Sequence, residues 1–258
     1  MSTHQKLDTV IVLDLDGTLI PDQEAFRTAA TAVLQAHLPD LDPTLDPVAD
    51  LLDRARRSWR TSPLRGTAQT LGVSSWETLW SDPNHKDPTT APTPSAHALT
   101  VWADTLTALG GDPRQSRSAA QMLISQREAL SLPYPGARES VEKLASENRL
   151  WLVTHGSSSL QRRKLHLAGL EKYFEFVFIS AEIGFLKDQD EFVDLIERST
   201  QVSHLAIRTV IGDSDSDLRL AARLGRPAVH ICSHRPCEDG GAGVEHEQSL
   251  ADWALRPD

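Results

Sequence analysis

Five short runs of mainly apolar, often β-branched residues constrain the fold of this chain more than any other feature. They are TVIVL at 9–13, LWLV at 150–153, FVFI at 176–179, TVI at 209–211 and AVHI at 228–231. The runs are continuous instead of alternating, which is typical of strands covered on both faces. Helical patterns at 160–170, 191–197 and 218–224 separate the last four runs, and another at 137–147 precedes them. The sequence therefore predicts an α/β fold with a Rossmann-like parallel sheet and right-handed crossovers.

A long segment separates the first run from the second, and most of it has helical periodicity. We expect helices at 24–36, 47–59, 76–80, 98–109 and 117–130. The Pro-rich segment at 82–94 predicts a loop, and so does the polar tail after residue 231, which ends in a short helix at 249–255. The simplest organisation is an α/β core domain, 1–20 and 133–258, with an all-helical domain, 21–132, inserted after its first strand.

Composition and charge exclude several classes of partner. With 26 basic and 36 acidic residues, the net charge of −10 disfavours general binding of nucleic acid polymers or anionic lipids. No apolar stretch approaches the roughly 20 residues of a membrane helix, and the N-terminus has no apolar run of a secretory signal. Two cysteines, Cys232 and Cys237, fit free thiols in a reducing compartment. We expect a cytoplasmic protein without nucleic acid or membrane partners.

Two carboxylates follow the first predicted strand, in the segment DLDGTL at 14–19. Asp14 and Asp16 stand at the carboxyl end of a buried parallel strand, which is where open α/β sheets bind ligands. The same residue types also serve in turns and calcium loops, but those lack the preceding buried strand. The segment therefore predicts a functional site.

Three more carboxylates follow the fourth strand, in the segment IGDSDSD at 211–217. Asp213, Asp215 and Asp217 would repel one another at neutral pH unless a cation lay among them. Hard oxygen ligands of this kind suit Mg²⁺. Spacing does not fix which of the three faces the ion, and acids at a helix start can also be ordinary caps.

Weaker signals lie elsewhere in the chain. Hydroxyls follow the second strand in VTHGSSS at 153–159, where a helix start can bind an anion, and a single lysine, Lys187, stands in a loop. His230, Cys232, His234 and Cys237 have the ligand types of a zinc site but no zinc-site spacing, so we interpret them as ordinary strand and loop residues. Arg65, between two predicted helices, reads equally as a surface turn or as a contact to the polar or anionic part of a substrate.

Taken in order, the segment at 14–19, Thr154, Lys187 and the segment at 212–217 resemble the motifs of the haloacid dehalogenase (HAD) superfamily. The resemblance covers roughly residues 8–20 and 133–232, and the helical insertion is similar to that family's C1-type cap. Residues 154–182 are similar to the branch that contains 5′-nucleotidases and N-acylneuraminate-9-phosphatase. The resemblance implies a phosphatase that hydrolyses a small phosphorylated metabolite, a nucleotide or sugar phosphate, as a monomer or homodimer.

The resemblance also implies a role for each matched residue. Asp14 would attack phosphorus and form an aspartyl-phosphate, while Asp16 would protonate the leaving oxygen and then activate water. Thr154 and Lys187 would hold the phosphoryl oxygens, and the neighbouring residues 155–156 would line the substrate site.

The implied cofactor is Mg²⁺. Its ligands would be Asp14, the backbone carbonyl of Asp16 and Asp213, with Asp217 supporting these ligands without touching the ion. Such a cation suits the attack of a carboxylate on a dianionic phosphate, which needs positive charge near both partners.

This chain departs from the branch at two positions. His155 replaces the usual Asn, and Asp188 replaces the usual Pro after the lysine, which weakens the expectation of a rigid loop. His155 either tunes substrate choice or is a solvated loop residue.

Three alternatives to a phosphatase stay open. A phosphomutase would use the same nucleophile and acid, and a non-catalytic phosphate-binding protein would keep the fold. A dehalogenase is disfavoured, because carbon–halogen cleavage needs no acid at the position of Asp16.

Overall fold

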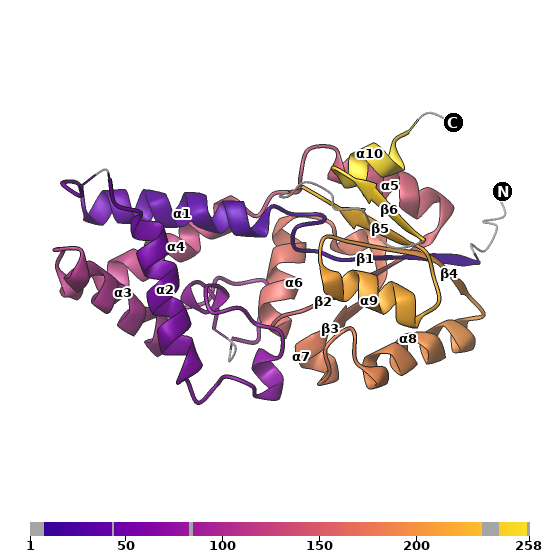
Figure 1. Ribbon diagram of the computed structural model, residues 1–258, viewed down its shortest axis with the longest axis horizontal. Coiled ribbons are helices and arrows are strands. Elements are labelled where there is room, and N and C mark those ends of the chain that lie inside the picture. Colours follow the sequence, from indigo (N-terminus) through magenta and orange to yellow (C-terminus); the bar gives the residue numbers. More distant parts are fainter. Residues whose placement is uncertain (1–7, 43, 83–84, 234–242, 257–258) are drawn as a thin grey trace. The chain divides into compact units, whose positions relative to one another are not determined.

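The computed structural model describes residues 8–42, 44–82, 85–233 and 243–256. Its six strands form one parallel sheet in the order β3-β2-β1-β4-β5-β6 (Figure 1). The strands are β1 (Thr9–Leu13), β2 (Arg149–Thr154), β3 (Phe174–Ile179), β4 (Ala206–Gly212), β5 (Ala228–Ile231) and β6 (Val244–Glu247). All five predicted strands are present, and the predicted α/β class with a parallel sheet is confirmed.

The sixth strand contradicts the prediction that the tail is entirely loop-like. β6 pairs with β5 at the sheet edge, where the Ala228 N–H donates to the Gly243 carbonyl at 3.1 Å and the Cys232 N–H to the Glu247 carbonyl at 2.8 Å. Its sequence, VEHE, has little β-propensity of its own. Pairing with an existing edge supplies the stabilisation instead, which a local pattern does not reveal.

Helices cover both faces of this sheet. α5 (Ala137–Glu147) and α10 (Leu250–Ala254) lie on one face, and α8 (Asp190–Ser203) and α9 (Asp215–Arg223) lie on the other (Figure 1). Phe192 and Ile196 of α8 and Leu220 of α9 pack on Val10 and Trp151 of the central strands. This burial on both faces explains why the strands read as continuous apolar runs. A short helix, α7 (Ser180–Ile183), follows β3.

The chain divides into two compact units. The first comprises residues 1–21, 133–155 and 168–258, and the second comprises 22–132 and 156–167. The second unit contains α1 (Asp22–His37), α2 (Pro47–Arg60), α3 (Ala96–Ala108), α4 (Ser116–Ala129) and α6 (Ser158–Leu167). The predicted helical insertion between β1 and β2 is therefore present. The segment predicted at 76–80 forms a single 3₁₀ turn, Glu77–Leu79, and described residues 85–94 form neither helix nor strand.

A buried ionic network lies inside the helical unit. The Lys164 ammonium of α6 contacts Asp22 at 2.9 Å and Glu77 at 3.0 Å, and Arg127 of α4 pairs with Asp22. The Arg127 guanidinium also stacks on the Trp80 ring, 4.5 Å from its centroid. All four charged side chains are almost completely buried, so each ion is compensated where water is excluded.

None of the described helices combines the length and apolar character needed to span a membrane.

Candidate active site

The site forms at the carboxyl edge of the sheet, around its central strand. β1 pairs with β2 on one side and with β4 on the other, so Leu13 lies between Leu152 and Ile211. The chain leaves β1 with the Asp14 N–H donating to the Ile211 carbonyl at 2.9 Å. This is the point where the strand order reverses, the usual ligand site of open α/β sheets.

Lys187 joins carboxylates from two different motifs. Its ammonium lies 3.2 Å from Asp14 Oδ1 and 2.6 Å from Asp217 Oδ1. All three side chains are buried, with exposed fractions of 5% or less. The structure thus brings together three sequence-predicted residues, of which Asp14 and Lys187 are 173 positions apart in the chain. The lysine is buried and paired, so it is not a solvated loop residue.

Asp213 lies in the same cluster, and a glycine makes its position possible. Carboxylate oxygens of Asp14, Asp213 and Asp217 fall within 4.8 Å of one another. Gly17 has a φ of +76°, and a Cβ there would come within 2.1 Å of Asp213 Oδ2. The glycine after Asp16 is therefore required for the close approach of the two loops.

The electrostatics of the cluster call for added positive charge. Burial, followed by Asp217, raises the pKa of Asp213 to about 7. Burial also raises the pKa of Asp14 well above its usual range, although Lys187 opposes that shift. Burial works to lower the pKa of Lys187, but Asp14 and Asp217 outweigh it and the pKa is raised. A single lysine therefore does not compensate the three carboxylates.

Asp217 is committed to structural contacts, whereas Asp14 and Asp213 offer oxygens to a cation. Asp217 Oδ2 accepts from the Ser214 N–H at 3.1 Å and from its hydroxyl at 2.6 Å, which caps α9. Its other oxygen contacts Lys187. By contrast, Asp14 keeps one oxygen away from Lys187, and Asp213 makes no side-chain hydrogen bond to a described side chain. The donor set fits a hard divalent cation held by Asp14 and Asp213.

His155 supports the loop that carries Lys187. The Lys187 N–H donates to His155 Nε2 at 3.0 Å, and the Leu186 N–H donates to Gln189 Oε1 at 2.7 Å. Burial, followed by the charge of Lys187, lowers the pKa of His155 to about 4, so the ring is neutral and carries its proton on Nδ1. His155 is half-buried and bonded, which excludes the interpretation as a solvated loop residue.

The remaining predicted residues lie in both units. Thr154 ends β2 and is buried, with its hydroxyl donating to the His155 carbonyl at 3.3 Å. Asp16 stands in the turn after β1, where its backbone forms an isolated β-bridge with Ile20. Gly156 and Arg65 belong to the helical unit, and Arg65 is exposed in a turn there. The carboxylate cluster belongs to the core unit.

Sequence reasoning missed several residues that shape the site. A Cβ at Gly212 would lie 2.1 Å from Asp217 Cγ, so this glycine admits the carboxylate. Ser214 and Asp217 form a reciprocal capping box at the start of α9. The spacing S-x-x-D is a readable signal for such a cap, and a glycine beside clustered acids is a signal for close packing.

The histidine and cysteine cluster differs from its expected composition. His230 Nδ1 lies 3.3 Å from His246 Nδ1, and Cys232 Sγ lies 3.7 Å from both. His230 Nε2 meets the Asp213 carbonyl at 3.1 Å. His246 was not among the expected members, and His234 and Cys237 lie outside the described residues. Cys232 takes part in a disulfide, so the expectation of free thiols is wrong for this residue; counting cysteines does not reveal pairing.

Comparison with known families decides the identity of this arrangement. The model of the haloacid dehalogenase-like hydrolases matches residues 9–225. The chain belongs to the haloacid dehalogenase-like hydrolases. The core with its helical insertion is thus the HAD core and cap, and the predicted family is confirmed. The protein is a HAD-family hydrolase.

Individual relatives agree with this family. A phosphoserine phosphatase of Thermus thermophilus is 31% identical over 238 residues, which are 86% of this chain and 88% of the relative. A pyrimidine 5′-nucleotidase of Escherichia coli is 25% identical over 134 residues, covering 52% of this chain and 57% of the relative. The magnesium-bound HAD-hydrolase YfnB of Bacillus subtilis has the same fold, with a TM-score of 0.60, 19% identity and coverage of 96% and 97%.

Proposed function

We propose that this HAD hydrolase is a Mg²⁺-dependent phosphatase of a small phosphorylated metabolite, working through an aspartyl-phosphate on Asp14. The observation that carries the proposal is the buried Lys187 ammonium in contact with Asp14, beside Asp213, at the sheet edge. A carboxylate that attacks a dianionic phosphate needs this concentration of positive charge. The names of the relatives, a phosphoserine phosphatase and a 5′-nucleotidase, support a phosphate monoester as substrate.

In the first step, a carboxylate oxygen of Asp14 attacks phosphorus, and the bond between phosphorus and the ester oxygen breaks. Lys187 favours the ionised form of Asp14 and so opposes the effect of burial on its pKa, and the same ammonium offsets charge on the phosphoryl oxygens. The buried Thr154 hydroxyl at the end of β2 is suited to donate to one of those oxygens. These groups position and stabilise charge, which is the main protein contribution to phosphoryl transfer.

Asp16 acts first as the general acid and then as the general base. As the ester oxygen departs with its bonding electrons, Asp16 donates a proton to it, so an alcohol leaves. The resulting Asp16 carboxylate then takes a proton from water, whose oxygen attacks the phosphorus and releases Asp14. An acid in this position favours ester hydrolysis over dehalogenation, because a halide leaves without a proton.

The metal would be held by Asp14, the backbone carbonyl of Asp16 and Asp213, with Asp217 orienting Lys187 and the start of α9. When bound, Mg²⁺ supplies positive charge to the reacting phosphoryl group. Ser214 and Gly212 keep Asp217 in place for this role.

Phosphate release tests the proposal directly. We expect the protein to release inorganic phosphate from at least one of a panel of nucleotide, sugar and amino acid phosphates with Mg²⁺, and not with EDTA. Asp14→Asn should lose at least about 10⁴-fold in kcat while keeping its circular dichroism spectrum. Near-normal turnover by this variant would refute Asp14 as nucleophile. Equimolar phosphoryl transfer without release of phosphate would instead indicate a phosphomutase.

A further inference from the structure

Three side chains with metal-binding atoms lie together at the edge of the sheet formed by β5 and β6. His230 and His246 are register partners on these two strands. Cys232 stands two positions after His230, and its N–H donates to the Glu247 carbonyl at 2.8 Å, which continues the strand pairing. Because side chains two positions apart point to the same face of a strand, the sulfur lies on the same face as the His230 ring.

The three ligand atoms have the spacing of a tetrahedral zinc site. His230 Nδ1 and His246 Nδ1 are 3.3 Å apart, and Cys232 Sγ is 3.7 Å from each of them. Zinc bonds of ~2.0–2.1 Å to nitrogen and ~2.3 Å to sulfur, at tetrahedral angles, separate two nitrogens by ~3.3 Å and a nitrogen from a sulfur by ~3.6 Å. One ion can therefore bond to all three atoms with little movement of the strands.

A backbone carbonyl orients the His230 ring for this role. The Asp213 carbonyl lies 3.1 Å from His230 Nε2 and can only accept a hydrogen bond, so this nitrogen carries a proton. In the neutral ring, Nδ1 then presents its lone pair to the cluster. Metal-binding histidines are typically held in this way, with the other ring nitrogen donating to a carbonyl or a carboxylate.

The His246 ring is directed at the same point. Its Nδ1 contacts only His230 and Cys232, and its Nε2 is buried without a hydrogen-bond partner among the described residues. Both histidines are half-buried, whereas Cys232 is 5% exposed, so an ion can enter past the two rings. The group contains no fourth side chain within the described ranges, which leaves the fourth position to water.

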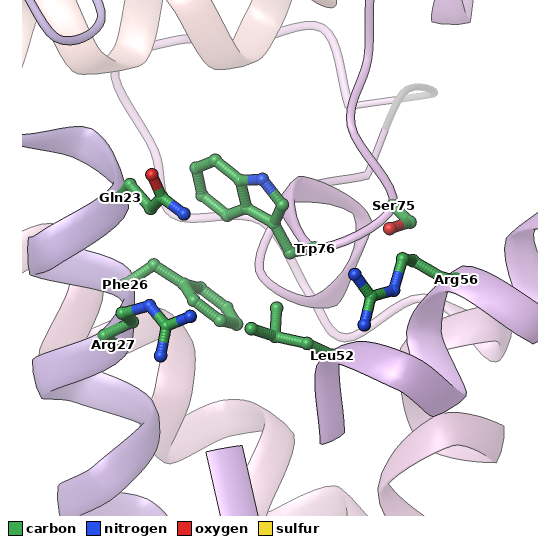
Figure 2. Close-up of a pocket in the computed structure, with 7 residues that line it drawn as sticks. All are labelled: Gln23, Phe26, Arg27, Leu52, Arg56, Ser75 and Trp76. Carbon is green, nitrogen blue, oxygen red and sulfur yellow. The ribbon is translucent and has the colours of Figure 1, made fainter. Parts of the chain in front are cut away.

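Ligand chemistry separates this cluster from other polar features of the described residues. The remaining groups of adjacent metal-ligating side chains consist of carboxylates alone, and oxygen ligands suit Mg²⁺. A small pocket between α1 and α2 is flanked by the guanidiniums of Arg27 and Arg56 (Figure 2), which have no lone pair to offer a metal. Imidazole and thiolate ligands instead suit Zn²⁺.

We propose that His230, Cys232 and His246 bind Zn²⁺, with water as the fourth ligand, when the disulfide of Cys232 is reduced. This role replaces the interpretation of His230 and Cys232 as ordinary strand and loop residues. The thiolate is the metal ligand, so the disulfide-bonded chain lacks the sulfur ligand. A dithiol reductant supplies two electrons: its thiols form a disulfide while the disulfide of Cys232 opens to two thiols. Zn²⁺ then displaces the proton of the Cys232 thiol, which passes to water.

Cobalt titration of the full chain tests the site without any substrate. Co²⁺ replaces Zn²⁺ in such sites, and its bond to a thiolate gives an intense charge-transfer band in the near ultraviolet. The metal-free chain would be reduced with a phosphine, which becomes the phosphine oxide, and titrated in excess Mg²⁺, which competes for the carboxylates. We expect the band to saturate at one Co²⁺ per chain and to disappear when Zn²⁺ is added. A reduced chain without this band would overturn the proposal.

Substitutions test the individual ligands. Cys232→Ser should abolish the band, and His230→Ala and His246→Ala should each weaken Co²⁺ binding at least about 100-fold, because loss of even a supporting partner costs about 10- to 100-fold. His204→Asn, at an exposed histidine of the core unit, is the matched control and should bind normally. Normal binding by either alanine variant would contradict the ligand set.

Folding is checked separately in each variant. Circular dichroism compares the variants with the wild type, and thermal unfolding of the reduced chains in Mg²⁺ with and without Zn²⁺ gives a second readout. Zn²⁺ should raise the Tm of the wild type and of His204→Asn, because a ligand of the folded state alone stabilises it. A Zn²⁺-dependent rise of equal size in Cys232→Ser would overturn the proposal.

Removal of the second cysteine tests the redox condition. Cys237 is the only other cysteine in the sequence, so Cys237→Ser leaves Cys232 without a partner for a disulfide within the chain. We expect this variant to show the band without reductant, whereas the oxidised wild type shows none. A full band in the oxidised wild type would refute the requirement for reduction, and no band in reduced Cys237→Ser would refute the three-residue ligand set.

Discussion

At the scale of single residues, the carboxyl of Asp213 makes stability depend on pH. Its pKa is raised to about 7 by burial and by Asp217, while the same carboxyl in the unfolded chain titrates near pH 4. Between these values the folded state holds a proton that the unfolded state has released. Stability of the metal-free protein therefore falls as pH rises through this window, and the cost is fully present above pH 7.

We therefore expect Mg²⁺ to stabilise the protein more at pH 8 than at pH 5. The shift from 3.8 to about 7 corresponds to a contribution of up to about 4 kcal/mol. Urea unfolding in EDTA and in Mg²⁺ at both pH values would measure it. Asp213→Asn removes the titrating group and should flatten the pH dependence in EDTA. An unchanged slope in this variant would assign the effect to another carboxylate.

Replacing Asp16, unlike replacing Asp14, should slow the reaction to a degree that depends on the leaving group of the substrate. Asp16→Asn removes the proton donor, so hydrolysis of alkyl phosphates should fall by about 10²- to 10⁴-fold. Esters with acidic leaving groups, such as p-nitrophenyl phosphate, should lose much less in the first step. Burst kinetics over a series of leaving groups measures this, and a uniform loss across the series would contradict the role of Asp16 as acid.

At the scale of the element, the end of β4 and the start of α9 together position the carboxylate of Asp217. Gly212 ends β4, Ser214 caps α9, and Asp217 in the first turn reaches back to Ser214 and across to Lys187. The same carboxylate thus stabilises a helix start and holds the Lys187 ammonium. Because its two oxygens serve the two purposes, stability and lysine position can be perturbed separately.

We expect Ser214→Ala and Gly212→Ala to separate these purposes. Ser214→Ala removes a capping hydroxyl and should cost about 1 kcal/mol of stability, with most of the activity kept. Gly212→Ala introduces a Cβ that would lie 2.1 Å from Asp217 Cγ, so Asp217 must move and activity should fall at least about tenfold. Phosphate release and urea unfolding of both variants check the distinction. Equal activity in the two variants would show that Asp217 tolerates displacement.

At the scale of the whole molecule, the division into units does not follow the chain. α6 comes after β2 in the sequence, yet it groups with the helical unit, where Lys164 compensates Asp22 and Glu77. The network also includes Arg127, from the last helix of the insertion. The packing of α6 is therefore fixed by buried charges as well as by apolar contacts.

Lys164→Met should destabilise the protein by about 3–5 kcal/mol, because it leaves buried carboxylates without a compensating charge. Lys143→Met on α5, where the side chain is exposed, is the matched control and should change stability by less than about 0.5 kcal/mol. Chemical unfolding monitored by tryptophan fluorescence measures both. A loss below 1 kcal/mol in Lys164→Met would show that water or protonation relieves the network.

Local sequence patterns determined the strand core, the two carboxylate motifs at strand ends and the helical character of the insertion. Continuous apolar runs predict strands buried on both faces, and acids directly after such runs predict a site at the carboxyl edge of the sheet. Both features can be read from a few neighbouring residues. The family resemblance extended this to Thr154 and Lys187, whose own neighbourhoods carry weak signals.

Only the tertiary structure decided which partners those residues meet. It showed which of the acids at 213–217 contacts Lys187, and it paired β6 with β5. It also placed the His155 ring against the backbone of Lys187 and set Arg27 and Arg56 around one pocket. Each of these depends on contacts between segments far apart in the chain, and on burial that changes the free energy of a charge. Such contacts are properties of the packed molecule, so no window of the sequence contains them.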